Sequence, residues 1–132
     1  MTALKPLRVL VTGSRTWESP DHVWGALNDV RDEALITNRR LVVVHGACPK
    51  GADAHAARWC ATATEFTNGV IEEAHPADWK NSGRQAGFVR NAHMVSLGAD
   101  VCLAFIRDGS RGASHTARLA EQAGIAVRRW TA

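Results

Sequence analysis

The fold prediction for this chain rests on a stretch in its middle, His45-Gly46-Ala47-Cys48-Pro49-Lys50-Gly51-Ala52-Asp53. The apolar run 41–44 leads into this stretch, and an amphipathic helix pattern leads out of it from Gly51 to Phe66. This order predicts a buried strand, a glycine-containing loop and a helix. Such a loop directs backbone N–H groups and the positive end of the helix dipole toward one point, where an anion such as a phosphate is stabilised. The stretch is therefore a candidate anion site.

Strand patterns and helix patterns alternate along the rest of the chain. The predicted strands cover 7–12, 41–44, 70–75, 101–106 and 125–127, and the predicted helices cover 20–38, 51–66, 85–97 and 115–123. Strands that alternate with helices indicate a parallel sheet with helices on both faces. We therefore expect the α/β class, with a single Rossmann-like domain over 1–132 and a parallel sheet of about five strands in the order 3-2-1-4-5.

Local signals set several of these boundaries. Ser19 and Pro20 are typical of a helix N-cap and of the first helical position. Glu72 and Glu73 place two charges in the third strand, which favours a position at the edge of the sheet. The segment 76–84 is the longest stretch without a helix or strand pattern, and long loops in compact domains are often functional.

The helix predicted over 85–97 has an apolar side and a polar side. The residues expected to be buried on its apolar side are Phe88, Val89, Ala92 and Val95. Arg90 and Met94 lie on the opposite face, where Met94 is either an exposed apolar residue of no consequence or part of a dimer contact or pocket wall. Trp79, which precedes this helix, either lies over a ligand or covers the sheet edge.

Composition and charge restrict the classes of function. Hydrophobic residues make up 45% and charged residues 22% of the chain, which is ordinary for a globular protein. The net charge of +3 and the isoelectric point near 9.1 suit an anionic ligand, a nucleotide or a nucleic acid. No segment is long and apolar enough to span a membrane, and 7–11 is interpreted as a strand and not a signal peptide. We therefore expect a cytoplasmic protein without a membrane partner.

The cysteines and histidines do not form a metal-site pattern. Cys48, Cys60 and Cys102 lack C-x-x-C spacing, which is typical of free thiols in a reducing compartment. The six histidines are spread along the predicted elements, and none makes a helical i, i+4 pair with another. Because metal sites in proteins need several ligands at set spacings, we expect no bound metal.

Two cofactor motifs are incomplete in this chain. Gly46 and Gly51 have the spacing of a Walker loop, but Ala52-Asp53 replaces the lysine and hydroxyl residue that NTPases place on phosphates and Mg²⁺. The loop after the first strand, Gly13-Ser14-Arg15, lacks the second glycine of the dinucleotide-enzyme fingerprint. The sequence therefore predicts neither an NTPase nor an NAD-dependent enzyme, and no cofactor.

Three strand-to-helix loops are expected to converge on one ligand. In the predicted strand order the first and fourth strands are neighbours, and ligands bind beyond the carboxyl ends of strands at such a switch point. Asp53 is either a partner of the helix dipole or an acceptor of ribose hydroxyls, while Arg15 and the Ser110–Gly112 turn suit phosphate oxygens. The predicted ligand-binding residues are Gly13, Ser14, Arg15, Gly46, Gly51, Asp53, Arg90, Asn91, Gly109, Ser110, Arg111 and Gly112.

Together these motifs resemble the SLOG superfamily, the Rossmann-like group that includes DprA DNA-processing proteins and LOG cytokinin-activating phosphoribohydrolases. The chain is most similar to the YspA-related branch, which consists of small proteins of phages and bacteria. The residues that carry the match are Val11-Thr12-Gly13-Ser14-Arg15, His45-Gly46, Gly51-Ala52-Asp53, His75-Pro76-Ala77-Asp78-Trp79, Ala86-Gly87, Arg90-Asn91, Met94 and Ser110-Arg111-Gly112. The resemblance implies a sheet-edge pocket for a nucleotide or nucleotide-derived ligand, often with homodimer formation, and the host-cell cytoplasm if the protein is phage-encoded.

The resemblance to LOG enzymes breaks down at the loop that carries their chemistry. LOG enzymes cleave the N-glycosidic bond of nucleoside 5′-monophosphates with a G-G-x-G-T-x-x-E loop and an arginine. The matching loop 109–116 has alanine in place of the threonine, and no glutamate follows. Arg90 matches the arginine, and the carboxylate such a reaction normally needs is left to Asp53 or Asp108, so these three are the catalytic candidates.

Three functions follow from these expectations. Glycine loops and arginines suffice for binding, so sensing of a nucleotide-like ligand is the leading hypothesis. LOG-type hydrolysis is the alternative. DprA-like nucleic-acid binding is the third, and it is motivated by the basic isoelectric point, although the tryptophans are not interleaved with basic residues as in a stacking platform.

Overall fold

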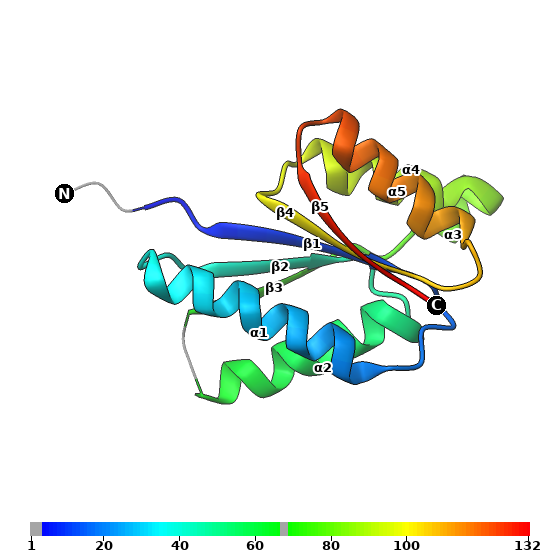
Figure 1. Cartoon of the computed structure of the whole chain (residues 1–132). Coiled ribbons are helices and arrows are strands. Elements are labelled where there is room, and N and C mark those ends of the chain that lie inside the picture. Colours follow the sequence, from blue (N-terminus) through cyan, green and yellow to red (C-terminus); the bar gives the residue numbers. More distant parts are fainter. Residues whose placement is uncertain (1–3, 67–68) are drawn as a thin grey trace.

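The computed structural model describes residues 4–66 and 69–132 and has three layers, with one sheet between two layers of helices (Figure 1). The sheet has five strands in the order β3-β2-β1-β4-β5, and all neighbouring strands are parallel. The strands are β1 (Leu7–Gly13), β2 (Leu41–His45), β3 (Val70–Ala74), β4 (Val101–Ile106) and β5 (Ala126–Thr131). The predicted α/β class and strand order are confirmed, as is the edge position of β3.

Helices cover both faces of the sheet. Figure 1 shows α1 (Pro20–Ile36) and α2 (Gly51–Phe66) on one face, and α4 (Ala86–Ser96) and α5 (Arg111–Gln122) on the other. Each face has its own apolar core, because successive side chains of a strand point to opposite faces. Val9 and Val11 of β1 pack in the core beneath α1 and α2, whereas Leu10 packs with Met94 of α4.

Most boundaries agree with the sequence pattern, but those of the last helix and the last strand do not. α5 begins at Arg111, whereas the sequence predicted a loop there and a helix only from residue 115. α2 and β4 begin and end where predicted, and α1 begins at Pro20 with Ser19 as its N-cap. β5 is longer than predicted, because it pairs with β4 as far as Thr131, which lies opposite Ile106. Backbone pairing with a buried neighbour thus extends this edge strand beyond its short apolar pattern.

The segment 76–84 also has more regular structure than predicted. It contains the short helix α3 (Trp79–Ser82) and the start of a 3₁₀ turn, η1 (Gly83–Gln85). Asp78 caps α3, because its carboxylate accepts a hydrogen bond from the Asn81 N–H at 3.2 Å. Such local side-chain caps are typical of helix starts, and here the cap fixes the position of Trp79.

The predicted buried face of α4 is wrong in most of its members. Three of the four residues expected there are exposed, namely Phe88 (42%), Val89 (54%) and Ala92. Asn91 and Met94 are buried instead, together with Val95. The helix has this orientation because Met94 and Val95 pack on Leu10 of the sheet, which leaves the Phe88–Val89 pair outside the core.

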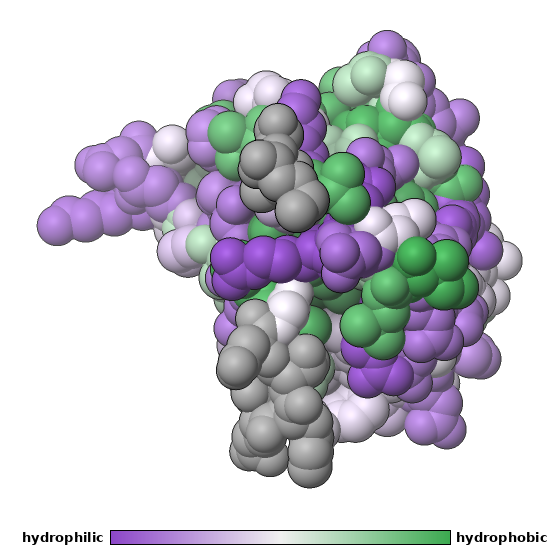
Figure 2. All heavy atoms as spheres, turned by 90° about the vertical axis from the view of Figure 1, so that its left-hand side faces the viewer, coloured by the Kyte–Doolittle hydropathy of each residue, from purple (hydrophilic) through white to green (hydrophobic). Residues whose placement is uncertain are grey.

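Figure 2 views the molecule from the end at which the strands of the sheet begin. Figure 2 shows apolar patches among polar surface at this end of the molecule. Leu35 and Ile36, at the last turn of α1, are exposed apolar residues. A groove of about 550 Å³ lies beside them, with Trp24 and Trp59 in its walls. No helix in the described ranges is long and apolar enough to cross a membrane.

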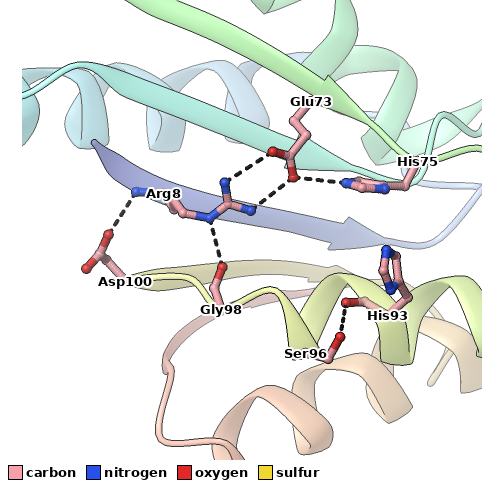
Figure 3. Close-up of polar contacts among 7 residues, drawn as sticks. All are labelled: Arg8, Glu73, His75, His93, Ser96, Gly98 and Asp100. Atoms are coloured by element: carbon pink, nitrogen blue, oxygen red, sulfur yellow. Dashed lines mark hydrogen bonds and ion pairs between the residues drawn. The ribbon is translucent and has the colours of Figure 1, made fainter. Parts of the chain in front are cut away.

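An ion-pair network attaches the edge strand β3 to the rest of the sheet (Figure 3). The Arg8 guanidinium donates two hydrogen bonds to the Glu73 carboxylate, at 3.1 and 2.9 Å, and one to the Gly98 carbonyl at 3.0 Å. Glu73 also lies 2.9 Å from the His75 ring nitrogen, and that ring meets the His93 ring edge-on. The network explains why a strand with two glutamates is stable at the sheet edge.

Candidate functional site

A cavity of about 360 Å³ lies beyond the carboxyl ends of β1 and β4, at the switch point of the sheet. Ligands of open α/β sheets bind at this position. Its walls come from the carboxyl end of β1, from the first turn of α2, from the region 79–94 and from the start of α5. The lining residues that were predicted from the sequence as ligand-binding are Gly13, Ser14, Arg15, Asp53, Arg90, Asn91, Ser110 and Gly112.

Asp53 is the buried carboxylate of this cavity. It lies in the first turn of α2 and is 8% exposed, and one carboxylate oxygen accepts a hydrogen bond from the Cys48 N–H at 3.3 Å. Burial raises the pKa of the Asp53 carboxyl above its ordinary value, while nearby His45, the Cys48 N–H and Arg90 oppose this shift. A buried carboxyl with a perturbed pKa in a cavity is a common property of functional sites.

Arg90 brings a cation to the same cavity from the opposite side of the sheet. Its guanidinium donates to the carbonyls of Gly46 and His75, and its Nε donates to the Asn91 side-chain oxygen at 2.6 Å. Burial lowers the pKa of Arg90, and the charge of Asp53 counteracts that effect. Because arginine stays protonated at neutral pH, the cavity holds a fixed cation beside a buried carboxylate.

Gly46 leaves room for this arginine. A Cβ at position 46 would lie 2.6 Å from Arg90 Nη1 and 2.7 Å from Cζ, so any side chain there would displace the guanidinium. Gly51 has a comparable role in the next turn, since its φ is +72° and a Cβ would collide with the Ser14 carbonyl oxygen. The two glycines of the loop therefore permit close packing in this structure, and Gly51 does not line the cavity.

His45 anchors the start of the loop. Its Nδ1 accepts a hydrogen bond from the Ala47 N–H at 2.9 Å, so Nε2 carries the proton and donates to the Glu72 carboxylate at 2.6 Å. The ring is buried, with 2% of its surface exposed. Because both ring nitrogens are occupied, His45 positions the loop and does not face a ligand.

Ser14 connects the loops after β1 and β4. Its Oγ accepts a hydrogen bond from the Arg107 N–H at 2.8 Å, and its own N–H donates to the Phe105 carbonyl at 2.9 Å. Its carbonyl in turn accepts from the Ala52 N–H at 3.3 Å. The three loops are thus in direct contact, while their convergence on one ligand stays a prediction.

Arg15 and Trp79 form the exposed rim of the cavity. The Arg15 guanidinium carbon lies 5.5 Å from the centre of the Trp79 ring, within the range of a cation–π contact. Trp79 is 50% exposed, so the ring offers a free aromatic surface. Trp79 lines the cavity, and its place over a ligand stays a prediction.

Other predicted residues lie outside this cavity. Gly46 lines a neighbouring cavity at the carboxyl ends of β2 and β3. Gly109 and Arg111 line a separate shallow hollow with Ser114, His115 and Arg118. Asp108 is exposed and ion-paired with Arg107, so of the predicted carboxylates only Asp53 faces the cavity.

Several lining residues were not among the predicted binding residues, namely Cys48, Arg84, Phe88 and Met94. Met94 was considered as a pocket wall, and its place in this lining confirms that alternative. Arg84 had no sequence signal beyond its position in the segment 76–84. Cys48 had a weak signal, since it belongs to the glycine-containing loop between β2 and α2. Across the described ranges, no group of three or more His, Cys, Asp or Glu residues is arranged to hold a metal ion.

Comparisons with known proteins agree with this architecture. The family model YAcAr, described as the YspA, cpYpsA-related SLOG family, matches residues 7–81. Gene 61 protein of Mycobacterium phage D29 is 47% identical over 120 residues, which cover 91% of this chain and 93% of that protein. No solved structure matches the chain. The match covers β1 to α3, including the loop with Asp53, and the chain belongs to the YspA, cpYpsA-related SLOG family.

Proposed function

We propose that this protein binds a nucleotide or a nucleotide-derived ligand in the cavity beyond the carboxyl ends of β1 and β4. Membership of the SLOG family suggests that a nucleotide-related ligand is bound or processed. One observation carries the proposal: the Asp53 carboxylate and the Arg90 guanidinium, which come from separate helices, line the same cavity. The cavity volume of about 360 Å³ lies within the range of small-molecule sites.

The charges in the cavity indicate how such a ligand is oriented. A carboxylate repels a phosphate but accepts hydrogen bonds from hydroxyl groups, so Asp53 suits the ribose. Arginine forms paired hydrogen bonds with phosphate oxygens, so Arg15 and Arg90 suit the phosphate. Trp79, which lies beside Arg15, offers an aromatic face for a base.

The experiment is isothermal titration calorimetry with a panel of nucleoside monophosphates, nucleoside diphosphates, ADP-ribose, NAD and cyclic nucleotides. We expect binding of at least one member, and we expect Asp53→Asn to weaken it by about tenfold, because a hydrogen-bond acceptor for the sugar hydroxyls becomes weaker. Asp29→Asn, on the exposed side of α1, is the matched control. A panel without any binder would refute the proposal.

The raised pKa of Asp53 supports a second candidate function, hydrolysis of the N-glycosidic bond. A carboxyl group with a raised pKa acts as a general acid or as a proton shuttle at neutral pH. Asp108 is exposed, pairs with Arg107 and is absent from the cavity lining, so Asp53 is the carboxylate on which this reaction would depend. Release of ribose 5-phosphate from a nucleoside monophosphate, abolished by Asp53→Asn and unchanged by Asp29→Asn, would establish it.

A further inference from the structure

A second cavity adjoins the first. It has a volume of about 560 Å³ and lies above the carboxyl ends of β2 and β3, where the loop 46–50 and the segment 76–79 form its walls. The two cavities share five lining residues, which are Arg15, Thr16, Cys48, Trp79 and Arg90. The proposed ligand site is therefore one of two compartments with a common border.

The border between the compartments is formed by side chains. Arg15 and Trp79 are both exposed, and they are held together by the cation–π contact at 5.5 Å. A contact of this kind at an exposed position is weak. The border between the compartments therefore depends on a weak contact between two side chains and on no backbone segment.

Two cations stand at this border. Arg15 and Arg90 line both compartments, and the positive charge of Arg15 contributes to the lowered pKa of Arg90. Arg15 has no hydrogen bond or ion pair to any part of the chain that the structure describes. Two like charges that line the same cavities favour an anion between them. Their position at the border places that anion between the compartments.

The second compartment differs from the first in its walls. It has no carboxylate in its lining and has apolar surface from Pro49, Pro76 and Ala77 next to the ring of Trp79. Lys50, at its mouth, is exposed. Flat apolar and aromatic walls with a nearby cation are typical of sites that stack a nucleic-acid base. A second base, or another planar ring, therefore suits this compartment.

We propose that the ligand is of the dinucleotide class, with one nucleoside beside Asp53, a second ring system against Pro49 and Trp79, and the linking phosphates between Arg15 and Arg90. This inference rests on the proposed function and names the ligand class of the same site. It accounts for the size of the second cavity, for the two shared arginines and for the difference in wall chemistry.

The test compares AMP, ADP, ADP-ribose and NAD by calorimetry on the wild-type protein and on two variants of the second compartment. Lys50→Ala removes its cation, and Ala77→Trp fills its volume. We expect NAD, which carries a second planar ring, to bind at least about tenfold more tightly than AMP and ADP-ribose, which do not, since stacking of one further ring contributes about that factor or more. Both variants should remove this difference while AMP affinity changes less than about twofold, the scale of a surface substitution.

Lys80→Ala is the matched control, because Lys80 is also exposed but lies on α3 outside both cavities. If AMP binds and NAD binds no better than AMP and ADP-ribose, or if Lys50→Ala and Ala77→Trp leave the advantage of NAD intact, the dinucleotide inference is overturned and the proposed function stands. If no nucleotide of either length binds, both are overturned. A folded state for each variant is checked by circular dichroism before titration.

Discussion

The Arg90 guanidinium donates a hydrogen bond to the carbonyl of Gly46 and lies where a side chain at position 46 would begin. The contact joins α4 to the loop after β2 and fixes the position of the half-buried cation of the cavity. We therefore expect Gly46→Ala to lower the free energy of unfolding by about 1–3 kcal/mol, as overpacking of a closely packed site does. Urea denaturation followed by tryptophan fluorescence measures this change.

Gly25→Ala is the control for that substitution. A Cβ at Gly25 has no heavy atom within 4 Å, and the residue lies in the middle of α1. We expect this variant to gain about 0.5–1 kcal/mol, because alanine restricts the unfolded chain more than glycine and favours the helix. Equal effects of the two substitutions would show that the contact with Arg90 does not constrain position 46.

The strand order was predictable from the sequence, whereas the direction of several side chains was not. Alternating strands and helices determine which loops meet at the switch point, and the 51–66 helix and 101–106 strand stand out by their patterns alone. The apolar pair Phe88–Val89 predicted the wrong buried face, because the packing of Met94 against Leu10 sets the rotation of α4. Rotation of a short helix depends on tertiary contacts, which a single periodic pattern does not report.

The Arg8–Glu73 pair makes stability depend on acidity. Hydrogen bonds from Arg8, with a further contribution from His75, hold the pKa of Glu73 at about 2, below the ordinary value of 4.5. A lowered pKa in the folded state means that the ionised carboxylate stabilises the protein above about pH 4.5. This contribution is lost as the pH falls from about 4.5 toward 2.

Glu73→Gln should therefore cost about 1 kcal/mol at pH 7, since the pair is partly exposed and solvent screens it. The cost should shrink as the pH approaches 2.5, where the wild-type carboxylate itself begins to be protonated. Urea titrations of both proteins between pH 2.5 and 7 measure this. Glu18→Gln, at an ion pair that is far more exposed, should show little change at any pH, and a pH-independent effect at Glu73 would contradict the assignment.

The cysteines should differ sharply in reactivity. Burial raises the pKa of the Cys60 and Cys102 thiols to about 12 each, so both remain protonated and inaccessible at pH 8. Cys48 is half-buried and lines both cavities. Iodoacetamide at pH 8 should alkylate Cys48 alone in the native protein, and a bound nucleotide should slow the reaction. Mass spectrometry of the intact protein and of Cys48→Ser measures this, and labelling of Cys60 in the folded state would be inconsistent with its burial.

Replacing Arg15 or Arg111 by alanine removes the same charge from two different places, so the two variants compare the effect of position on nucleotide affinity. Arg15 lines both cavities, whereas Arg111 lines the separate hollow beside His115. Arg15→Ala should weaken nucleotide binding about tenfold, the usual loss for a charge-assisted hydrogen bond, and Arg111→Ala should change it less than about twofold. Calorimetry with the strongest ligand of the panel decides between them. If Arg111→Ala is as costly as Arg15→Ala, the ligand extends over the start of α5.

We expect the ionised Asp53 carboxylate to lower the stability of the folded protein, because the group is buried beside the cavity. Its pKa is raised in the folded state, chiefly by burial, so the native protein binds the proton more tightly than the unfolded chain. Stability then falls as the pH rises from the ordinary value of 3.8 through the raised pKa, because ionisation of the buried group is unfavourable.

Asp53→Asn removes this ionisation and keeps an oxygen that accepts from the Cys48 N–H. We expect the variant to unfold at a higher temperature, with a gain of about 1 kcal/mol at pH 7, while its affinity for nucleotides falls. Thermal unfolding at pH 5 and pH 8 measures the effect. The gain should be larger at pH 8, and a loss of stability at that pH would mean that the ionised carboxylate stabilises the fold.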